Sequence, residues 1–113
     1  MHEVSLCEGV VGIVRDAQAK YGFDRVARIR LEIGALSHVE PNALRHAFPP
    51  VALGTAAEGA ELIIDEPSGK AWCADCNESV TIGRRGEPCP RCQGFRLLVQ
   101  SGDEMRVKDM EIA

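Results

Sequence analysis

Aromatic residues are scarce in this chain. Among 113 residues there are three Phe, one Tyr and one Trp, so aromatics make up only 4% of the sequence. Hydrophobic residues nevertheless account for 45%, and the core must therefore be built mainly from Val, Ile, Leu and Ala. The length suits one compact domain with a small appendage.

Long apolar runs and clustered basic residues are also missing. No stretch approaches the roughly 20 apolar residues that span a bilayer, and the first seven residues lack the basic start and apolar centre of a signal peptide. The formal net charge is −4 and Lys and Arg are scattered, whereas binding to nucleic acid depends on clustered positive charge. We therefore expect a cytoplasmic protein that binds neither membrane nor nucleic acid.

The spacing of the cysteines is the most specific pattern in the sequence. Four of the five form two Cys-x2-Cys pairs, Cys73/Cys76 and Cys89/Cys92, with 12 residues between the pairs. In the cytoplasm such pairs bind metal more often than they form disulfides, and two pairs provide a full tetrahedral shell of thiolates for Zn²⁺. Four protein ligands leave no position for water or substrate, so we expect this zinc to be structural.

The residues around the cysteine pairs, and the one cysteine outside them, also fit this interpretation. Asn77 and Gly94 follow the two cysteine pairs, and both residue types tolerate the positive φ of tight metal-binding turns. The fifth cysteine, Cys7, lies on the apolar face of a predicted helix, which indicates a buried core residue.

A first helix is predicted by the spacing of apolar residues between Ser5 and Tyr21, with Ser5 as its N-cap and Gly22 as its end. The predicted buried stripe consists of Leu6, Val10, Ile13, Ala17 and Tyr21, widened by Cys7, Val11 and Val14.

Strands and a second helix follow. Alternation over Arg25–Ile33 predicts a half-buried strand. Pro41 opens a second helical segment that Pro49-Pro50 should end or kink. Glu61–Ile64 predicts another strand, and Glu104–Ala113 a terminal strand with an irregularity near Asp109, which we place in the same sheet.

These elements predict an α+β fold, with two helices packed on a small mixed sheet of about three strands and an inserted, zinc-ribbon-like four-cysteine module. The predicted domains are residues 1–69 plus 102–113, which contain the helices and the mixed sheet, and residues 70–101, which would bind zinc. Both crossings between them pass through glycine, Gly69 and Gly102, which would permit limited hinge movement.

The N-terminus offers a second kind of metal site. The terminal amine of Met1, the backbone nitrogen of His2 and its imidazole can close adjacent chelate rings on one ion, and nickel(II) favours such nitrogen-rich, tetragonal sites. The Glu3 amide, or a carboxylate from Glu3 or Glu40, can complete the shell. Any chain that begins Met-His has these groups, so the motif alone favours a solvated terminus over a metal site.

Residues 1–7, MHEVSLC, resemble the start of the HypA/HybF family, accessory proteins that insert nickel into nickel–iron hydrogenases. The resemblance continues in order and at similar spacing over essentially the whole chain. It includes Leu31–Ser37 (LEIGALS), Val39-Glu40-Pro41, Ala57–Ala60 (AEGA), Trp72-Cys73, Cys89-Pro90-x-Cys92 and Ser101–Val107 (SGDEMRV).

This resemblance implies a nickel metallochaperone. His2 would be the principal nickel ligand and Glu3 would assist it, while Cys73, Cys76, Cys89 and Cys92 would hold structural zinc. The implied partners are the GTPase HypB and the hydrogenase large subunit, with urease accessory proteins served by some relatives. Whether the chain acts as a monomer or a homodimer is left open.

Two further residues, Glu40 and His38, have two interpretations each, and His46 has one. Glu40 either belongs to the nickel site or is an acid that complements the N-terminus of the second helix. His38 departs from the family pattern, which often has Cys or a small residue there, and is either an extra nickel ligand or a solvated loop residue. His46 is expected on the surface of the second helix.

Other functions have less support. A zinc-ribbon protein-interaction module without nickel is the main alternative, and an enzyme is disfavoured because we find no nucleophile–base pair, phosphate loop or open metal position.

We expect nickel to bind with moderate affinity in an exposed site and to be lost on modest acidification, because an imidazole must be neutral to coordinate metal.

Overall fold

The computed structural model describes residues 2–113, and these form two compact units. The first unit contains residues 2–31, 39–64 and 107–113, and the second contains residues 32–38 and 65–106. The domain bounds inferred from the sequence, 1–69 plus 102–113 and 70–101, remain predictions. Within residues 2–113, neither helix combines the length and apolar character needed to cross a membrane.

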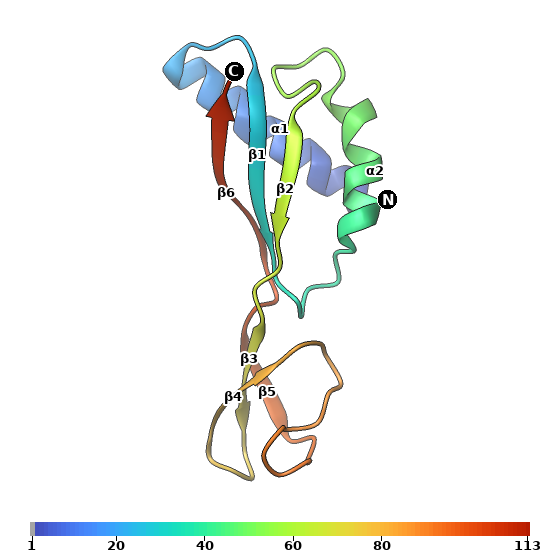
Figure 1. The fold of residues 1–113 in the computed structure, drawn as a ribbon, viewed down its shortest axis with the longest axis vertical. Helices are drawn as coiled ribbons and strands as arrows, with labels where there is room; N and C mark the ends of the chain where they lie inside the picture. The colour runs from blue at the N-terminus through green and yellow to red at the C-terminus, as the bar shows by residue number, and fades with distance from the viewer. Residues whose placement is uncertain (1) are drawn as a thin grey trace. The chain divides into compact units, whose positions relative to one another are not determined.

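Two helices and a three-stranded sheet make up the α+β part of the fold (Figure 1). The helices are α1 (His2–Tyr21) and α2 (Pro41–Ala52), and the sheet has the order β2 (Glu61–Asp65), β1 (Val26–Ile33), β6 (Met105–Ile112). The terminal strand therefore joins this sheet, as the sequence predicts.

The sheet is mixed. Arg28 of β1 contacts Glu111 of β6, and Glu32 contacts Arg106, so positions in β6 fall as those in β1 rise and the two strands are antiparallel. The arrows of β2 and β6 point in opposite directions in Figure 1, which makes β2 parallel to β1. This confirms the predicted class of two helices with a small mixed sheet.

Helix α1 begins earlier than the sequence analysis predicts. It starts at His2 instead of being capped by Ser5, and it ends where predicted, at Gly22, whose φ is +68°. No Pro or Gly interrupts residues 2–6, and an acidic Glu3 in the first turn stabilises the start of a helix through its dipole. The prediction of a Ser5 cap was therefore wrong, and His2 and Glu3 are helical residues.

The buried face of α1 also differs from the predicted stripe. Its buried residues are Cys7, Val10, Val11 and Val14, whereas Ile13 and Tyr21 are 45% and 68% exposed. Cys7 is fully buried, as predicted, with its Sγ 3.6 Å from the carbonyl oxygen of Leu44 in α2. Burial, followed by the nearby charge of Glu3, raises the pKa of this thiol.

Helix α2 passes through its two prolines and continues to Ala52. Of the two predicted effects of Pro49-Pro50, an end of the helix is therefore wrong, and a kink stays a prediction. Each proline removes one backbone donor, yet Phe48 and Ala52 are both buried, and their packing favours a continued helix. At the other end Glu40 is the N-cap, and its Oε2 accepts a hydrogen bond from the Ala43 N–H at 2.8 Å.

This cap gives the first testable prediction. Glu40→Ala should lower the free energy of unfolding by about 1 kcal/mol, since it leaves the Ala43 N–H without its partner. Glu40→Gln retains an acceptor oxygen at the same place and should cost clearly less. Urea denaturation of both variants measures the difference, and equal stability of Glu40→Ala and the parent would contradict the capping role.

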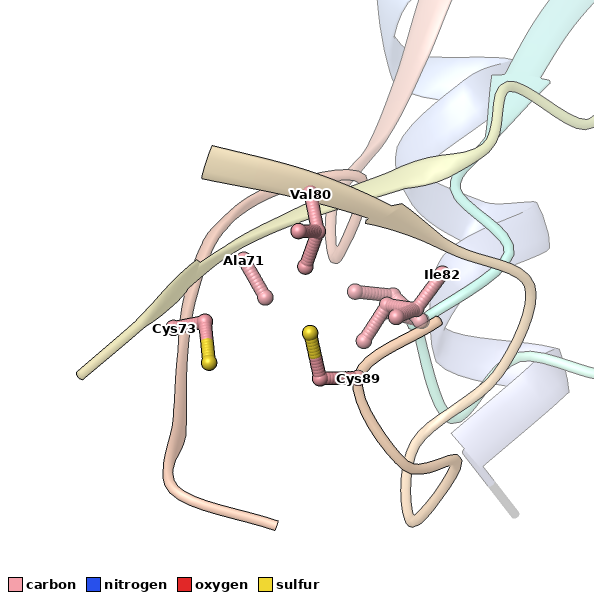
Figure 2. Close-up of a cluster of buried hydrophobic side chains, with 6 residues drawn as sticks. Ala71, Cys73, Val80, Ile82 and Cys89 are labelled. Atoms are coloured by element: carbon pink, nitrogen blue, oxygen red, sulfur yellow. The ribbon is translucent and has the colours of Figure 1, made fainter. Parts of the chain in front are cut away.

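The second unit contains an antiparallel sheet of β4 (Glu78–Ile82), β3 (Gly69–Cys73) and β5 (Leu97–Ser101), with β3 in the middle. Its small core is drawn in Figure 2. It consists of Leu36, Ala71, Cys73, Val80, Ile82 and Cys89, with Cys76, Leu97 and Val99 packed against it.

Three glycines allow close approach within the second unit. A Cβ on Gly34 would lie 2.0 Å from the carbonyl oxygen of Gly102, and one on Gly69 would lie 2.1 Å from the Leu36 side chain. Gly102 itself has a φ of +88°. Gly69 and Gly102 are thus required by packing and backbone conformation, while the hinge movement suggested by their position remains a prediction.

Candidate metal sites

The four paired cysteines converge. Their Sγ atoms all lie within 4.8 Å of one another, with 3.7 Å between Cys73 and Cys92 and 3.8 Å between Cys76 and Cys89. A regular tetrahedron with metal–sulfur bonds of about 2.3 Å has sulfurs roughly 3.8 Å apart. The spacing therefore fits one tetrahedral metal ion.

Local backbone structure positions these thiols. Cys73 is the last residue of β3, and both Cys73 and Cys89 are buried in the core of the second unit, where Figure 2 shows their sulfurs on the same side of the sheet. Cys92 is exposed. The site is thus anchored by one buried cysteine from each pair.

The turns after the pairs agree only partly with the sequence analysis. Asn77 has the expected positive φ of 56°, but in the second turn Gln93, with a φ of 63°, takes the role predicted for Gly94. Gly94 is needed for a different reason, since a Cβ there would lie 3.1 Å from an Asp75 oxygen and 3.3 Å from the Cys92 sulfur.

Backbone N–H groups point at three of the sulfurs. Cys76 N–H donates to Cys73, Arg91 N–H to Cys89 and Gly94 N–H to Cys92, each at 3.4 Å. Hydrogen bonds of this kind stabilise thiolates. The site therefore provides part of the charge compensation that thiolate ligands need.

The close approach of the sulfurs and the surrounding N–H groups shift the pKa values of the cysteines in opposite directions. Backbone N–H groups, that of Cys92 first, lower the pKa of Cys89 to about 7, against the opposing effect of burial. The hydrogen bond with Cys92, followed by burial, raises the pKa of Cys76 to about 12. Four close sulfurs resist simultaneous ionisation, and a bound metal ion removes this resistance.

Two ion pairs flank the cysteines and were missed in the sequence analysis. Arg91 contacts Glu78, and Arg96 lies 2.9 Å from Asp75. Asp75 and Arg91 occupy the variable positions inside the two Cys-x2-Cys pairs, but each pairs with a residue outside them, so the motif itself held no signal for these contacts. These pairs are exposed and contribute little to stability.

Among the described residues, the candidate nickel ligands do not form one cluster of side chains. His2 and Glu3 are adjacent, with 4.0 Å between Nδ1 and Oε2, and the His2 side chain is 59% exposed. Glu40 caps α2, while His38 and His46 are exposed, the latter as predicted. Met1 lies outside the described residues. Within residues 2–113, only the four cysteines form a group of three or more metal-ligand side chains.

Four converging thiols, one at the end of β3 and three in the loops between β3 and β5, form a site of the kind found in metal-binding proteins. Comparison with known proteins is more specific. The family described as "Hydrogenase/urease nickel incorporation, metallochaperone, hypA" matches residues 1–112, and the chain belongs to this family of nickel metallochaperones.

Curated relatives support the same assignment. The chain is 52% identical over 112 residues to "Hydrogenase maturation factor HypA 2" of Bradyrhizobium diazoefficiens, covering 99% of each chain. It is also 52% identical, with the same coverage, to "Hydrogenase maturation factor HypA" of Paracoccus denitrificans. The role in hydrogenase maturation and the predicted family are thereby confirmed.

Solved structures agree on the fold. The solution structure of the nickel metallochaperone HypA from Helicobacter pylori matches with a TM-score of 0.69 at 20% identity, covering 97% of this chain and 96% of that one. A second solution structure of a HypA protein gives a TM-score of 0.70 at 21% identity, covering 100% and 97%. At these identities the likeness concerns the fold alone.

Proposed function

We propose that this metallochaperone binds Ni(II) at Met1, His2 and Glu3 and delivers it to the large subunit of a nickel–iron hydrogenase. The four cysteines Cys73, Cys76, Cys89 and Cys92 hold a structural zinc ion. The observation that carries the nickel site is the position of His2, exposed in the first turn of α1 beside Glu3.

The start of a helix suits amide ligation of a metal. The first four N–H groups of an α-helix have no acceptor within the helix, so binding through the His2 or Glu3 nitrogen breaks no helical hydrogen bond. The positive end of the helix dipole opposes a cation, but a deprotonated amide and the Glu3 carboxylate bring compensating negative charge. Glu3 thus assists electrostatically whether or not its oxygen reaches the metal.

Exposure of the site is part of the function. A deeply buried ion would have to be released by unfolding, whereas an ion at an exposed terminus can exchange its nitrogens one at a time for the ligands of a partner. Because His2 must lose its proton to coordinate, nickel should dissociate on modest acidification before zinc does.

The cysteine site fits zinc by its donors and spacing. Bound zinc supplies the positive charge that four thiolates require and cross-links the loops after β3 and before β5. With four protein ligands it offers no position for a substrate. This zinc therefore stabilises structure and takes no direct part in nickel transfer.

Partners follow from the family. We propose that the GTPase HypB takes part in nickel delivery in the cytoplasm, and that urease is a second destination for the nickel, in keeping with the hydrogenase and urease named for this family. Glu40 has a structural role as a helix cap, and His38 is exposed. We propose neither as a principal nickel ligand.

Nickel titration of untagged, zinc-loaded protein tests the proposal. His2→Ala should weaken nickel binding at least about 100-fold, since it removes one of the chelate rings and the imidazole. One extra residue before Met1 should have a similar effect, because it moves the amine out of chelating position. The matched controls His38→Ala and His46→Ala should bind nickel like the parent.

Zinc content, measured on the same samples, shows whether the fold is retained. Unchanged nickel affinity in both altered N-termini would overturn the N-terminal site. If nickel binding instead disappeared with the cysteines alone, the alternative of a zinc-ribbon interaction module without N-terminal nickel would be favoured.

A further inference from the structure

The four cysteines of the metal site differ in their exposure to solvent. Cys73 and Cys89 are fully buried and belong to the core of the second unit, where Figure 2 draws them with the other core side chains. Cys76 is half-buried, and Cys92 is exposed. A small molecule in solution therefore reaches Cys92 more easily than it reaches the other three cysteines.

The residue next to the Cys92 sulfur keeps that sulfur accessible. A Cβ at Gly94 would lie 3.3 Å from Sγ of Cys92, so any other residue at position 94 would cover part of the sulfur. The Gly94 N–H donates to the same sulfur at 3.4 Å, but Cys73 and Cys89 accept backbone hydrogen bonds of the same length. Access, rather than hydrogen bonding, distinguishes Cys92 from these two.

Thiolates, rather than thiols, react with peroxides. A cysteine loses its proton when it ligates a metal ion, so all four cysteines of the occupied site are thiolates and exposure decides which of them reacts first. The fifth cysteine, Cys7, lies in α1 and is fully buried. Exposure and thiolate character are therefore combined at Cys92.

A second thiolate lies beside Cys92. The sulfur of Cys73 is 3.7 Å from that of Cys92, and the sulfurs of a disulfide are about 2.05 Å apart, so the two atoms must approach by roughly 1.7 Å. Cys73 is the last residue of β3, whereas Cys92 lies in the loop before β5. The loop can therefore make this movement while the end of the strand stays in place.

From this exposure and the adjacent sulfur, we propose that Cys92 is a modification site for hydrogen peroxide and that oxidised Cys92 closes a disulfide with Cys73. The Cys92 thiolate first attacks a peroxide oxygen: an S–O bond forms, the O–O bond breaks and hydroxide leaves. The Cys73 thiolate then attacks the sulfenic sulfur: an S–S bond forms, the S–O bond breaks and a second hydroxide leaves. Two thiolates thus give two electrons to one peroxide.

The disulfide removes half of the metal site. Only Cys76 and Cys89 remain as ligands, and a structural zinc ion needs four. The second unit therefore loses its zinc when Cys92 is oxidised, and reduction of the disulfide restores the site, since a disulfide is a reversible product. The inference rests on the proposed zinc occupancy of the four cysteines and is independent of the proposed nickel site.

Peroxide treatment of the zinc-loaded, full-length protein, without nickel or added thiol, tests the proposal. A chromogenic chelator follows released zinc, dimedone traps sulfenic acid, and mass spectrometry without reduction maps the disulfides. We expect trapping at Cys92, a Cys73–Cys92 disulfide that accumulates as zinc is lost, and an unmodified Cys7. Excess dithiothreitol with zinc should restore the zinc content.

Two variants separate the role of Cys92 from the stability of the site. Cys92→His retains four ligands, because three cysteines and one histidine also bind structural zinc, but it removes the reactive sulfur. Its zinc should be released by peroxide at least about tenfold more slowly than that of the parent. Cys76→His is the matched control, which keeps Cys92 and Cys73 and should lose zinc to peroxide like the parent.

Three results would overturn the proposal: sulfenic acid trapped first at Cys76, a main disulfide within one pair such as Cys89–Cys92, or equal rates of zinc loss in Cys92→His and the parent. Zinc content measured before peroxide is added tests the zinc assignment separately. A protein that binds no zinc would refute that assignment and this inference together, whereas bound zinc that survives peroxide would refute the inference alone.

Discussion

Removal of zinc should unfold the second unit and leave the helices of the first unit formed. Two of the six buried residues in the core of the second unit, Cys73 and Cys89, are themselves metal ligands, and the others are Leu36, Ala71, Val80 and Ile82. So small a core cannot sustain a fold without additional cross-links. Structural zinc in small domains contributes apparent free energies of roughly 10–16 kcal/mol.

Two measurements distinguish the unfolding of the second unit from the retention of the helices in the first. After chelation, hydrogen exchange should lose the protection of amides in β3, β4 and β5, while the helical circular dichroism, which arises from α1 and α2, should change little. Cys89→Ser should reproduce the effect and lower the zinc content. Cys7→Ala is the matched control, since Cys7 is a buried cysteine of α1 outside the metal site. Retained protection of β3–β5 without metal would contradict a structural role for zinc.

The four-cysteine site could be predicted from sequence because the spacing that defines it is local. Two Cys-x2-Cys pairs fix four donors through the geometry of short turns, and the converged sulfurs agree with that reading. The strands β1, β2 and β6 were also predicted from local patterns, most clearly β1, whose apolar residues alternate with a period of two. The strands β3, β4 and β5 of the cysteine module were not predicted individually.

Features that depend on tertiary contacts could not be predicted from the sequence. The helical period does not say which residues of a broad apolar stripe face the core, and Ile13 and Tyr21 are exposed although they belong to that stripe. The early start of α1 at His2 likewise escaped prediction, because Ser5 is a good N-cap in isolation.

The candidate nickel ligands show most clearly what a short sequence motif cannot predict. A Met-His start has the same chelating atoms in any chain, and only the family match gives it meaning here. The structure adds that His2 and Glu3 begin a helix, a detail that motif reading did not provide. For Glu40, the hydrogen bond to Ala43 gives direct support to one of the two interpretations that the sequence left open.

Gly34→Ala should be among the most destabilising single substitutions in the second unit. The new Cβ would lie 2.0 Å from the carbonyl oxygen of Gly102 and 2.3 Å from its carbon. Both are backbone atoms, held by the hydrogen bonds from Gly34 N–H to Glu104 and from Leu36 N–H to Gly102, so they cannot move away as a flexible side chain can. Overpacking of this kind costs about 3 kcal/mol.

Gly12→Ala provides the matched control for adding one methyl group. A Cβ on Gly12 meets nothing within 4 Å, and alanine in the middle of α1 should stabilise the helix by about 1 kcal/mol through its higher helix propensity. Denaturant unfolding followed by hydrogen exchange should therefore show opposite changes for the two variants, with the loss confined to the second unit for Gly34→Ala. Equal stability of Gly34→Ala and the parent would show that the close packing of Gly34 on Gly102 is not required, because the backbone would then have relaxed at little cost.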